Sequence, residues 1–136
     1  QAAIARPGKD LTIVAYMKMT HEALAAAEVL AKDGIEAEVV DLRTLRPWDT
    51  DTVLSSVRRT GRAVVASEAP RMGGLGADVS ATIAEECWGD LKAPVARVGA
   101  LDTPIPFSVV LEKIILPGKD QIVQAARQAL GDKAPA

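Results

Sequence analysis

A glycine-rich segment is the first part of the sequence whose residue types could do chemistry. It joins a strand-like run to a helix-like run and contains Glu68, Arg71, Gly73, Gly74 and Gly76. Glycines in that position can hold a phosphate, and a carboxylate beside a guanidinium can take part in proton transfer. The spacing is GGxG rather than GxGxxG, and the lysine and hydroxyl of a P-loop are absent. We expect the glycines to serve a tight turn and a close helix approach, with anion binding as the alternative.

Two further residues could be reactive, but each stands alone. His21 is the only histidine and Cys87 the only cysteine. Without a nucleophile or second ligand nearby in sequence, we expect His21 on the surface and Cys87 in the core. A single cysteine excludes an intrachain disulfide and favours a reducing compartment, the bacterial cytoplasm or an organelle matrix. The sequence predicts no catalytic residues, no cofactor site and no metal site in this chain.

A cluster of alternating charges and a tryptophan occupy the segment VVDLRTLRPWDTD. The charged residues are Asp41, Arg43, Arg46 and Asp49. Alternating signs around a turn predict ion pairs that pin the loop. Trp48 is either a lid over the core or an anchor at an interface. The segment LDTPIPFS contains Pro104, Pro106 and Phe107, and it is either a rigid structural loop or a docking loop for a partner.

These residues must be positioned by elements that alternate along the chain. Apolar, β-rich runs predict strands over residues 11–16, 37–42, 63–67 and 93–98, with residues 2–6 as an antiparallel edge strand. Helical spacing predicts helices over residues 20–32, 50–59, 77–88, 108–115 and 121–130, with Thr20 and Asp49 as N-caps. The alternation predicts an α/β fold, a three-layer α/β/α domain with a mixed, mostly parallel five-stranded sheet.

Composition narrows the class of protein. The chain has 136 residues, of which 49% are hydrophobic and 25% charged, which suits one globular domain over residues 1–136 with a frayed tail at 131–136. The net charge of −2 argues against a nucleic-acid surface. No apolar run reaches the roughly 20 residues that span a bilayer. Because the chain does not begin with methionine, we expect it to be a fragment of a longer one.

Taken in order, several motifs resemble one family. DLRTLRPWD, SEAPRMGGLGADV, APVARV, LDTPIPFS and LEKIILP are similar to the transketolase-type C-terminal domain. More narrowly, they resemble the beta subunit of the thiamine-diphosphate-dependent 2-oxoacid dehydrogenase decarboxylase component, of pyruvate or branched-chain type. The resemblance implies an assembly domain in an enzyme that decarboxylates a 2-oxoacid oxidatively and transfers the acyl group to lipoyl groups. It also implies that an upstream domain and the alpha subunit hold thiamine diphosphate and Mg²⁺.

The resemblance further implies three partners: a second beta subunit, the alpha subunit, and the subunit-binding domain of a lipoyl acyltransferase. Relatives often read L-D-A-P where this chain has Lys92 and Pro94 in LKAP, which reverses one charge at a partner contact. Candidate interface residues are therefore Lys92, Pro94, Pro104, Pro106, Phe107 and Trp48. One alternative is the C-terminal domain of transketolase or deoxyxylulose-phosphate synthase, against which LDTPIPFS and LEKIILP count. The other is a free-standing small-ligand or nucleotide-binding domain.

Overall fold

The fold is a single five-stranded sheet between two layers of helices. We describe a computed structural model over residues 1–43, 47–70, 74–100 and 118–131. Its strands are β1 (Ala3–Arg6), β2 (Leu11–Ala15), β3 (Ala37–Asp41), β4 (Ala63–Pro70) and β5 (Ala96–Ala100). Its helices are α1 (Lys18–Lys32), α2 (Thr50–Thr60), α3 (Leu75–Glu86) and α5 (Lys119–Ala129).

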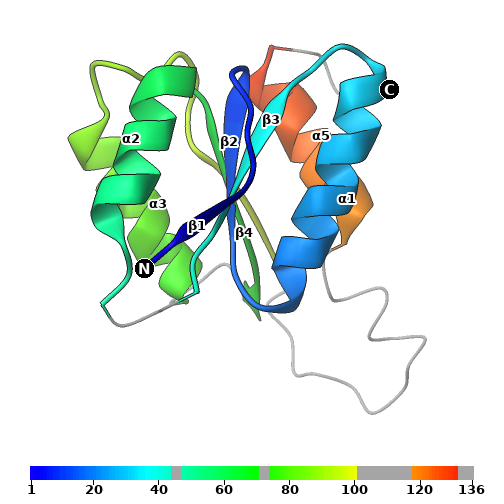
Figure 1. Cartoon of the computed structure of the whole chain (residues 1–136). Coiled ribbons are helices and arrows are strands. Elements are labelled where there is room, and N and C mark those ends of the chain that lie inside the picture. The colour runs from blue at the N-terminus through cyan, green and yellow to red at the C-terminus, as the bar shows by residue number, and fades with distance from the viewer. Residues whose placement is uncertain (44–46, 71–73, 101–117, 132–136) are drawn as a thin grey trace.

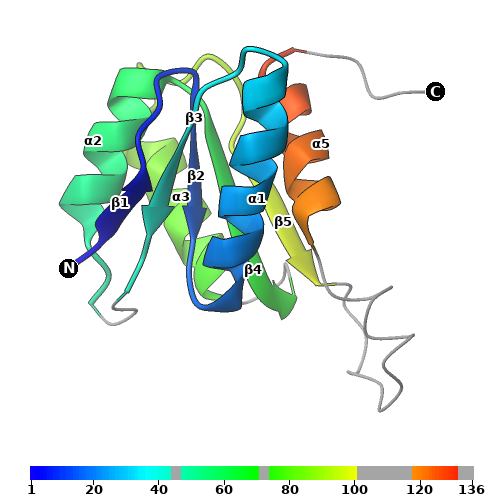
Figure 2. The same cartoon turned by 45° about the vertical axis from the view of Figure 1, so that its right-hand side comes forward.

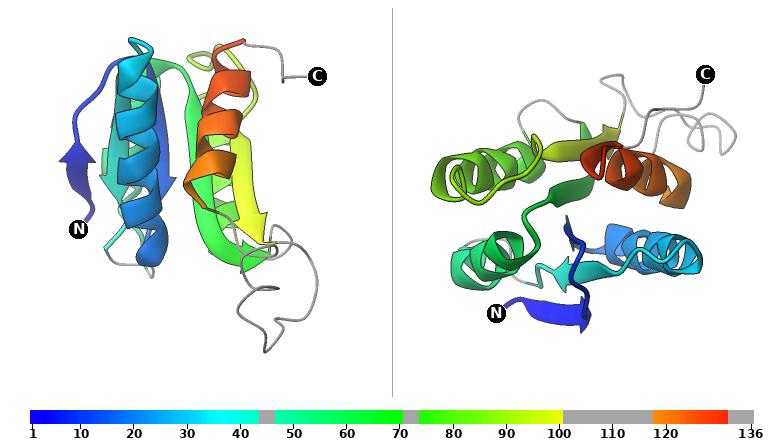
Figure 3. Two further views of the ribbon diagram at one scale, coloured as in Figure 1. Left: turned by 90° about the vertical axis from the view of Figure 1, so that its right-hand side faces the viewer. Right: turned by 90° about the horizontal axis from the view of Figure 1, so that it is seen from above.

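The sheet has the strand order β1-β3-β2-β4-β5, and β1 and β5 lie at its opposite edges (Figure 2). Only β1 runs antiparallel to its neighbour among these strands, while β3, β2, β4 and β5 pair in parallel. Helices α1 and α5 cover one face, and α2 and α3 cover the other (Figures 1 and 3). This arrangement confirms the predicted fold class.

Each face of the sheet has its own hydrophobic core. Every residue of β2 is buried, because a central parallel strand is covered on both sides. Alternate β2 side chains divide between the two cores. Leu11 and Ile13 belong to the first core, which lies under α1 and α5, whereas Val14 belongs to the second core, which lies under α2 and α3. The connection from β1 to β2 requires Gly8, because a Cβ there would lie 2.4 Å from backbone atoms of Ala37 and Glu38.

The predicted helix boundaries are partly confirmed. Asp49 caps α2 as expected and accepts a hydrogen bond from the Thr52 backbone N–H at 3.1 Å. The predicted Thr20 cap is wrong: α1 begins at Lys18, and Met17, with φ of 57°, is the N-cap. Thr20 is instead buried within α1, where its hydroxyl donates to Asp41 Oδ1 at 3.2 Å. The chain turns into α1 earlier than expected because Met17 takes a conformation that its sequence position does not signal.

Two further expectations fall on residues that the structure does not describe. The predicted helix over 108–115 lies outside the described residues, as does the predicted frayed tail after Gly131. Within the described part of the chain, no helix combines the length and the apolar character needed to cross a membrane.

Candidate functional site: a groove between α3 and β5

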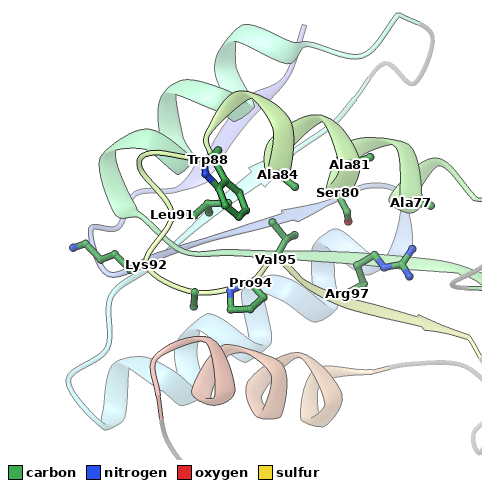
Figure 4. A pocket seen from close by; sticks show the side chains of 11 residues that line it. Ala77, Ser80, Ala81, Ala84, Trp88, Leu91, Lys92, Pro94, Val95 and Arg97 are labelled. Carbon is green, nitrogen blue, oxygen red and sulfur yellow. The ribbon is translucent and has the colours of Figure 1, made fainter.

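A groove of about 690 Å³ lies between α3 and the chain that leads into β5 (Figure 4). Helix α3 contributes small side chains, those of Ala77, Ser80, Ala81 and Ala84. The segment after the helix contributes Trp88, Leu91, Lys92, Ala93, Pro94, Val95 and Arg97. The lining is therefore largely apolar, with two cationic side chains and no carboxylate.

Helical spacing explains why α3 can form one wall. Ala77, Ala81 and Ala84 recur on one face of the helix, while Val79 and Ile83 point into the core from another face. The alanine methyl groups are too small to fill the space beside β5. The same helix thus packs firmly on the sheet and leaves a hollow at its edge.

Backbone hydrogen bonds fix the other wall. The N–H groups of Asp90 and Leu91 donate to the Cys87 carbonyl at 2.9 and 3.0 Å and end α3. The Lys92 N–H donates to the Gly61 carbonyl at 2.8 Å, which ties this segment to the end of α2. Leu91 and Val95 then pack against the second core. These hydrogen bonds and core contacts hold the second wall of the groove in place.

Trp88 is the largest exposed side chain at the groove. Its exposed fraction is 82%, and its ring stands at the rim near Leu91 (Figure 4). A tryptophan so exposed gains little for folding of this chain and is a residue type that anchors protein interfaces.

Lys92 and Arg97 give the groove its charge. Figure 4 shows the two side chains at opposite ends of the groove. The acidic residue nearest to Lys92 in the sequence, Asp90, forms an ion pair with Arg58 at 3.9 Å instead. No ion pair within 4.0 Å joins Lys92 to a carboxylate of the described residues. Lys92 is exposed and therefore presents its charge to solvent.

The glycine-rich segment lies between β4 and α3, at the carboxyl edge of the sheet, and the structure describes part of it. Gly74 is the N-cap of α3, and a Cβ on Gly76 would make ordinary contacts with Ser67 and Val65 at 3.5 and 3.7 Å. Helix α3 therefore lies close to β4, although a methyl group at Gly76 would still fit. Arg71 and Gly73 lie outside the described residues, so the turn and the anion-binding alternative stay predictions.

Glu68 lies at the same edge with one buried carboxylate oxygen, Oε1, that has no hydrogen-bond partner. Nearby, the Tyr16 and Ser67 hydroxyls are hydrogen-bonded to each other at 2.6 Å. The described residues do not bring a second titratable group within hydrogen-bond distance of that oxygen. A proton-transfer pair between Glu68 and Arg71 stays a prediction.

A buried polar cluster that the sequence analysis missed lies under α2. Glu38 of β3 is 3% exposed, accepts from Ser56 Oγ at 2.8 Å and from the Gly8 N–H at 3.1 Å, and pairs with Arg59. Thr12 of β2 bonds Ser56 and Thr60 at 2.7 and 2.8 Å. Burial alone would raise the pKa of Glu38, but the hydrogen bonds from Arg59, Ser56 and Gly8 outweigh it and lower that pKa. In the sequence, the available signal for this cluster is a glutamate within the otherwise apolar run AEVV, residues 37–40.

The charge cluster before α2 is only partly an ion-pair network. Arg43 Nε lies 3.5 Å from Asp41 Oδ2, whereas Asp49 bonds Thr52 and the Ala2 backbone N–H. The hydrogen bonds from Thr52, chiefly that of its side chain, lower the pKa of Asp49. Arg46 lies outside the described residues.

The remaining sequence candidates are separated in space. Trp48 is half-buried against the second core, away from the groove. His21 is exposed on α1, and Cys87 is fully buried, where burial raises the pKa of its thiol. Among the described residues, no group of three or more His, Cys, Asp or Glu side chains could hold a metal ion. Pro104, Pro106 and Phe107 lie outside the described residues.

Of the candidate interface residues, the structure brings Lys92 and Pro94 together in the groove. Sequence reasoning missed their neighbours Trp88, Leu91 and Arg97. The available signal was the recurrence of alanines at 77, 81 and 84 in register with Trp88, on a face of α3 that does not enter the core.

Comparison with known proteins shows the family to which this domain is similar. The family described as "Transketolase, C-terminal domain" matches residues 1–122. The chain is 51% identical over 130 residues to the beta subunit of acetoin:2,6-dichlorophenolindophenol oxidoreductase from Cupriavidus necator, covering 96% of this chain and 38% of the relative. It is 48% identical over 130 residues to the pyruvate dehydrogenase E1 component subunit beta of Bacillus subtilis, covering 96% and 40%.

A solved structure, "Split gene transketolase, inactive beta4 tetramer", aligns with a TM-score of 0.79 and 35% identity, covering 98% of this chain and 42% of that one. The chain thus spans 38–42% of the length of these three relatives. The sequence matches and the structural match both cover nearly all of the chain. It belongs to the transketolase C-terminal domain family.

Proposed function

We propose that this chain is the assembly and interface domain of the beta subunit of a thiamine-diphosphate-dependent 2-oxoacid dehydrogenase decarboxylase component. The observation that carries the proposal is similarity at 48–51% identity to beta subunits over 96% of the chain. The domain contributes surfaces that join subunits, and the complete enzyme performs oxidative decarboxylation and transfers the acyl group to lipoyl groups.

In this proposal, thiamine diphosphate and Mg²⁺ are bound by other parts of the enzyme. Mg²⁺ requires oxygen ligands, usually carboxylates, beside the diphosphate. The groove lining has no carboxylate, and the described residues form no acidic cluster of metal-binding size. The residues of this chain that the structure describes therefore do not fit a Mg²⁺-diphosphate site, and we route no catalytic step through them.

The substrate of the complete enzyme is selected outside this chain. The relatives include a pyruvate dehydrogenase component and an acetoin oxidoreductase, at 48% and 51% identity. This small difference does not separate the two substrates, so acetoin joins pyruvate and branched-chain 2-oxoacids as a candidate. Assays of the complete beta subunit with its alpha subunit, with each compound and a redox dye, will distinguish them.

Three partners follow from the proposal: a second beta subunit, an alpha subunit, and the subunit-binding domain of a lipoyl acyltransferase. The similar solved structure is described as a tetramer of beta chains, which supports contact between beta subunits. Together with the single cysteine, this assembly suits a reducing compartment, the bacterial cytoplasm or an organelle matrix.

Two measurements test the proposal. Calorimetry on the 136-residue chain is expected to show no tight, Mg²⁺-dependent binding of thiamine diphosphate. Size-exclusion chromatography with light scattering is expected to show that a beta subunit from which this domain has been removed no longer assembles with the alpha subunit. Tight cofactor binding by the chain alone, or normal assembly without it, would contradict the proposal.

The alternatives have their own tests. A transketolase or deoxyxylulose-phosphate synthase has no lipoyl partner, so capture by the subunit-binding domain of a lipoyl acyltransferase favours the dehydrogenase. A free-standing nucleotide-binding domain predicts that phosphate or nucleotides at millimolar concentration change the fluorescence of Trp48 or Trp88. An unchanged spectrum leaves that alternative without support.

A further inference from the structure

We propose that the groove between α3 and β5 is a docking site for an acidic, amphipathic segment of a partner protein. The inference rests on the proposed assembly role and deepens it, since it assigns a place and a chemistry to one contact. The occupant has a large apolar side chain for the groove and carboxylates at its flanks.

The apolar part of the argument comes from the walls. Ala81 and Ala84 of α3 face Val95 and Pro94 across a space of about 690 Å³. Trp88 stands at the rim with 82% of its surface exposed. Covering a tryptophan and an alanine-lined wall removes apolar surface from water, which is the main driving force of protein association.

The charge expected of the partner segment follows from the two residues at the ends of the groove. Lys92 and Arg97 are the ionisable residues of the lining, and both are cationic. The stem of Lys92 lies over Gly61, where a Cβ would come within 3.1 Å of Cδ and Cε. Figure 4 shows the Lys92 side chain at one end of the groove. A partner with carboxylates complements this pattern, whereas a basic partner meets like charges.

Strand geometry sets the length of the segment. Residues 92 and 97 are five positions apart, so their Cα atoms lie at most about 17 Å apart at the rise of an extended chain. A helix covers that span in about 11 residues, or three turns. Two acidic positions about three turns apart on one helix, with apolar residues between them, therefore match the groove.

A second copy of this chain is a poorer occupant. A two-fold contact that joins groove to groove would bring Lys92 and Arg97 of one copy against the same patch of the other. Such a contact repeats positive charge on both sides and has no carboxylate from the lining to neutralise it. The observations favour a different, acidic partner.

Fluorine NMR provides the test. The chain is labelled with 5-fluorotryptophan, which gives signals from its two tryptophans, and Trp88→Phe assigns the Trp88 signal. The probes are two 16-residue amphipathic peptides with the same leucine face, one with glutamate and one with lysine at the polar positions. We expect the glutamate peptide to shift the Trp88 signal and to bind about tenfold more tightly than the lysine peptide.

Matched variants separate docking from folding. Lys92→Glu is expected to weaken the glutamate peptide about tenfold and to improve binding of the lysine peptide. Lys32→Glu, an exposed lysine on α1 across the sheet, is the control and is expected to change neither. Circular dichroism verifies that each variant is folded. Trp88→Ala, a second variant at the rim, removes the reporter itself, so its binding is measured by calorimetry and is expected to be weaker for both peptides.

Several outcomes would overturn the inference. One is equal or tighter binding of the lysine peptide, and another is binding that Lys92→Glu leaves unchanged. A Trp88 signal that shifts with protein concentration alone would identify a second copy as the occupant. A Trp88 signal already protected in the isolated complete beta subunit would identify another segment of that polypeptide. None of these readouts uses enzyme activity, so the docking inference can fail while the assembly proposal stands.

Discussion

The Lys92 side chain lies across Gly61, the left-handed residue that ends α2. The Lys92 N–H also donates to the Gly61 carbonyl at 2.8 Å. Gly61 has φ of 77°, and a Cβ there would approach Cδ and Cε of Lys92 at 3.1 Å. One glycine thus ends a helix and also supports the residue that places positive charge at the groove.

Gly61→Ala is expected to destabilise the chain by about 1–2 kcal/mol, because a non-glycine residue in the left-handed region is strained. Gly34→Ala is the matched control: Gly34 has φ of 78°, but nothing lies within 4 Å of the position of its Cβ. Urea denaturation of both variants separates the backbone strain from the added contact with Lys92. We expect the larger loss at Gly61, and equal losses at the two positions would show that the Lys92 stem moves aside without cost.

Acid is expected to weaken the fold through Glu38. Its pKa in the folded chain lies below the ordinary value of 4.5, so the unfolded chain takes up the proton first. The stability that this group contributes is complete above about pH 4.5 and is lost as the pH falls through the lowered pKa. Urea denaturation between pH 7 and pH 3 measures the loss.

Glu38→Gln is expected to be less stable than the unmodified chain at pH 7, because Arg59 loses its ionic partner, and to depend less on acid. Glu36→Gln, an exposed position 3.9 Å from Lys9, serves as the control and is expected to keep the acid dependence. An unchanged acid slope in Glu38→Gln would place the sensitivity elsewhere.

The buried hydroxyl pairs beneath α2 are expected to stabilise the domain modestly. Thr12→Val removes both bonds that Thr12 makes, while Ser56 keeps Glu38 and Thr60 keeps the Arg62 carbonyl. Since no buried donor or acceptor among these is orphaned, the expected loss is about 1 kcal/mol. Thermal and urea denaturation check this value. A loss above about 3 kcal/mol would mean that the cluster acts cooperatively.

Trp88 is expected to matter for docking and hardly at all for folding. Because it is 82% exposed, Trp88→Ala is expected to change stability by less than about 0.5 kcal/mol. Ile83→Ala, at a fully buried position on α3 five residues before Trp88, is expected to cost about 2–5 kcal/mol. Comparable losses for the two variants in urea denaturation would assign Trp88 a structural role.

Cys87 is expected to resist thiol reagents in the folded chain. It has no exposed surface, and burial raises the pKa of its thiol, so the reactive thiolate is scarce. Labelling with iodoacetamide at pH 8 is expected to be slow, and to become fast in denaturant. Rapid labelling under native conditions would reveal local opening around the end of α3.

The sequence by itself determined the class of fold. Buried parallel strands are apolar throughout, amphipathic helices repeat at helical spacing, and local caps such as Asp49 and Gly61 depend only on nearby residues. For this reason the existence of the five strands and the start of α2 could be predicted, although the last strand, predicted over residues 93–98, forms at Ala96–Ala100, and α2 continues one residue further, to Thr60. Thr20 misled the prediction because Met17, which has φ of 57°, starts α1 earlier than any local capping signal indicates.

The tertiary structure alone decided the site. Lys92 and Pro94 could be proposed as interface residues, but the wall that faces them comes from α3, and the residue under the Lys92 stem, Gly61, lies 31 positions earlier in the sequence. Trp48 and Trp88 look alike in the sequence, yet packing against the second core half-buries the first and leaves the second exposed. Exposure, charge complementarity and grooves arise between elements, so they depend on how the elements pack and not on any local pattern.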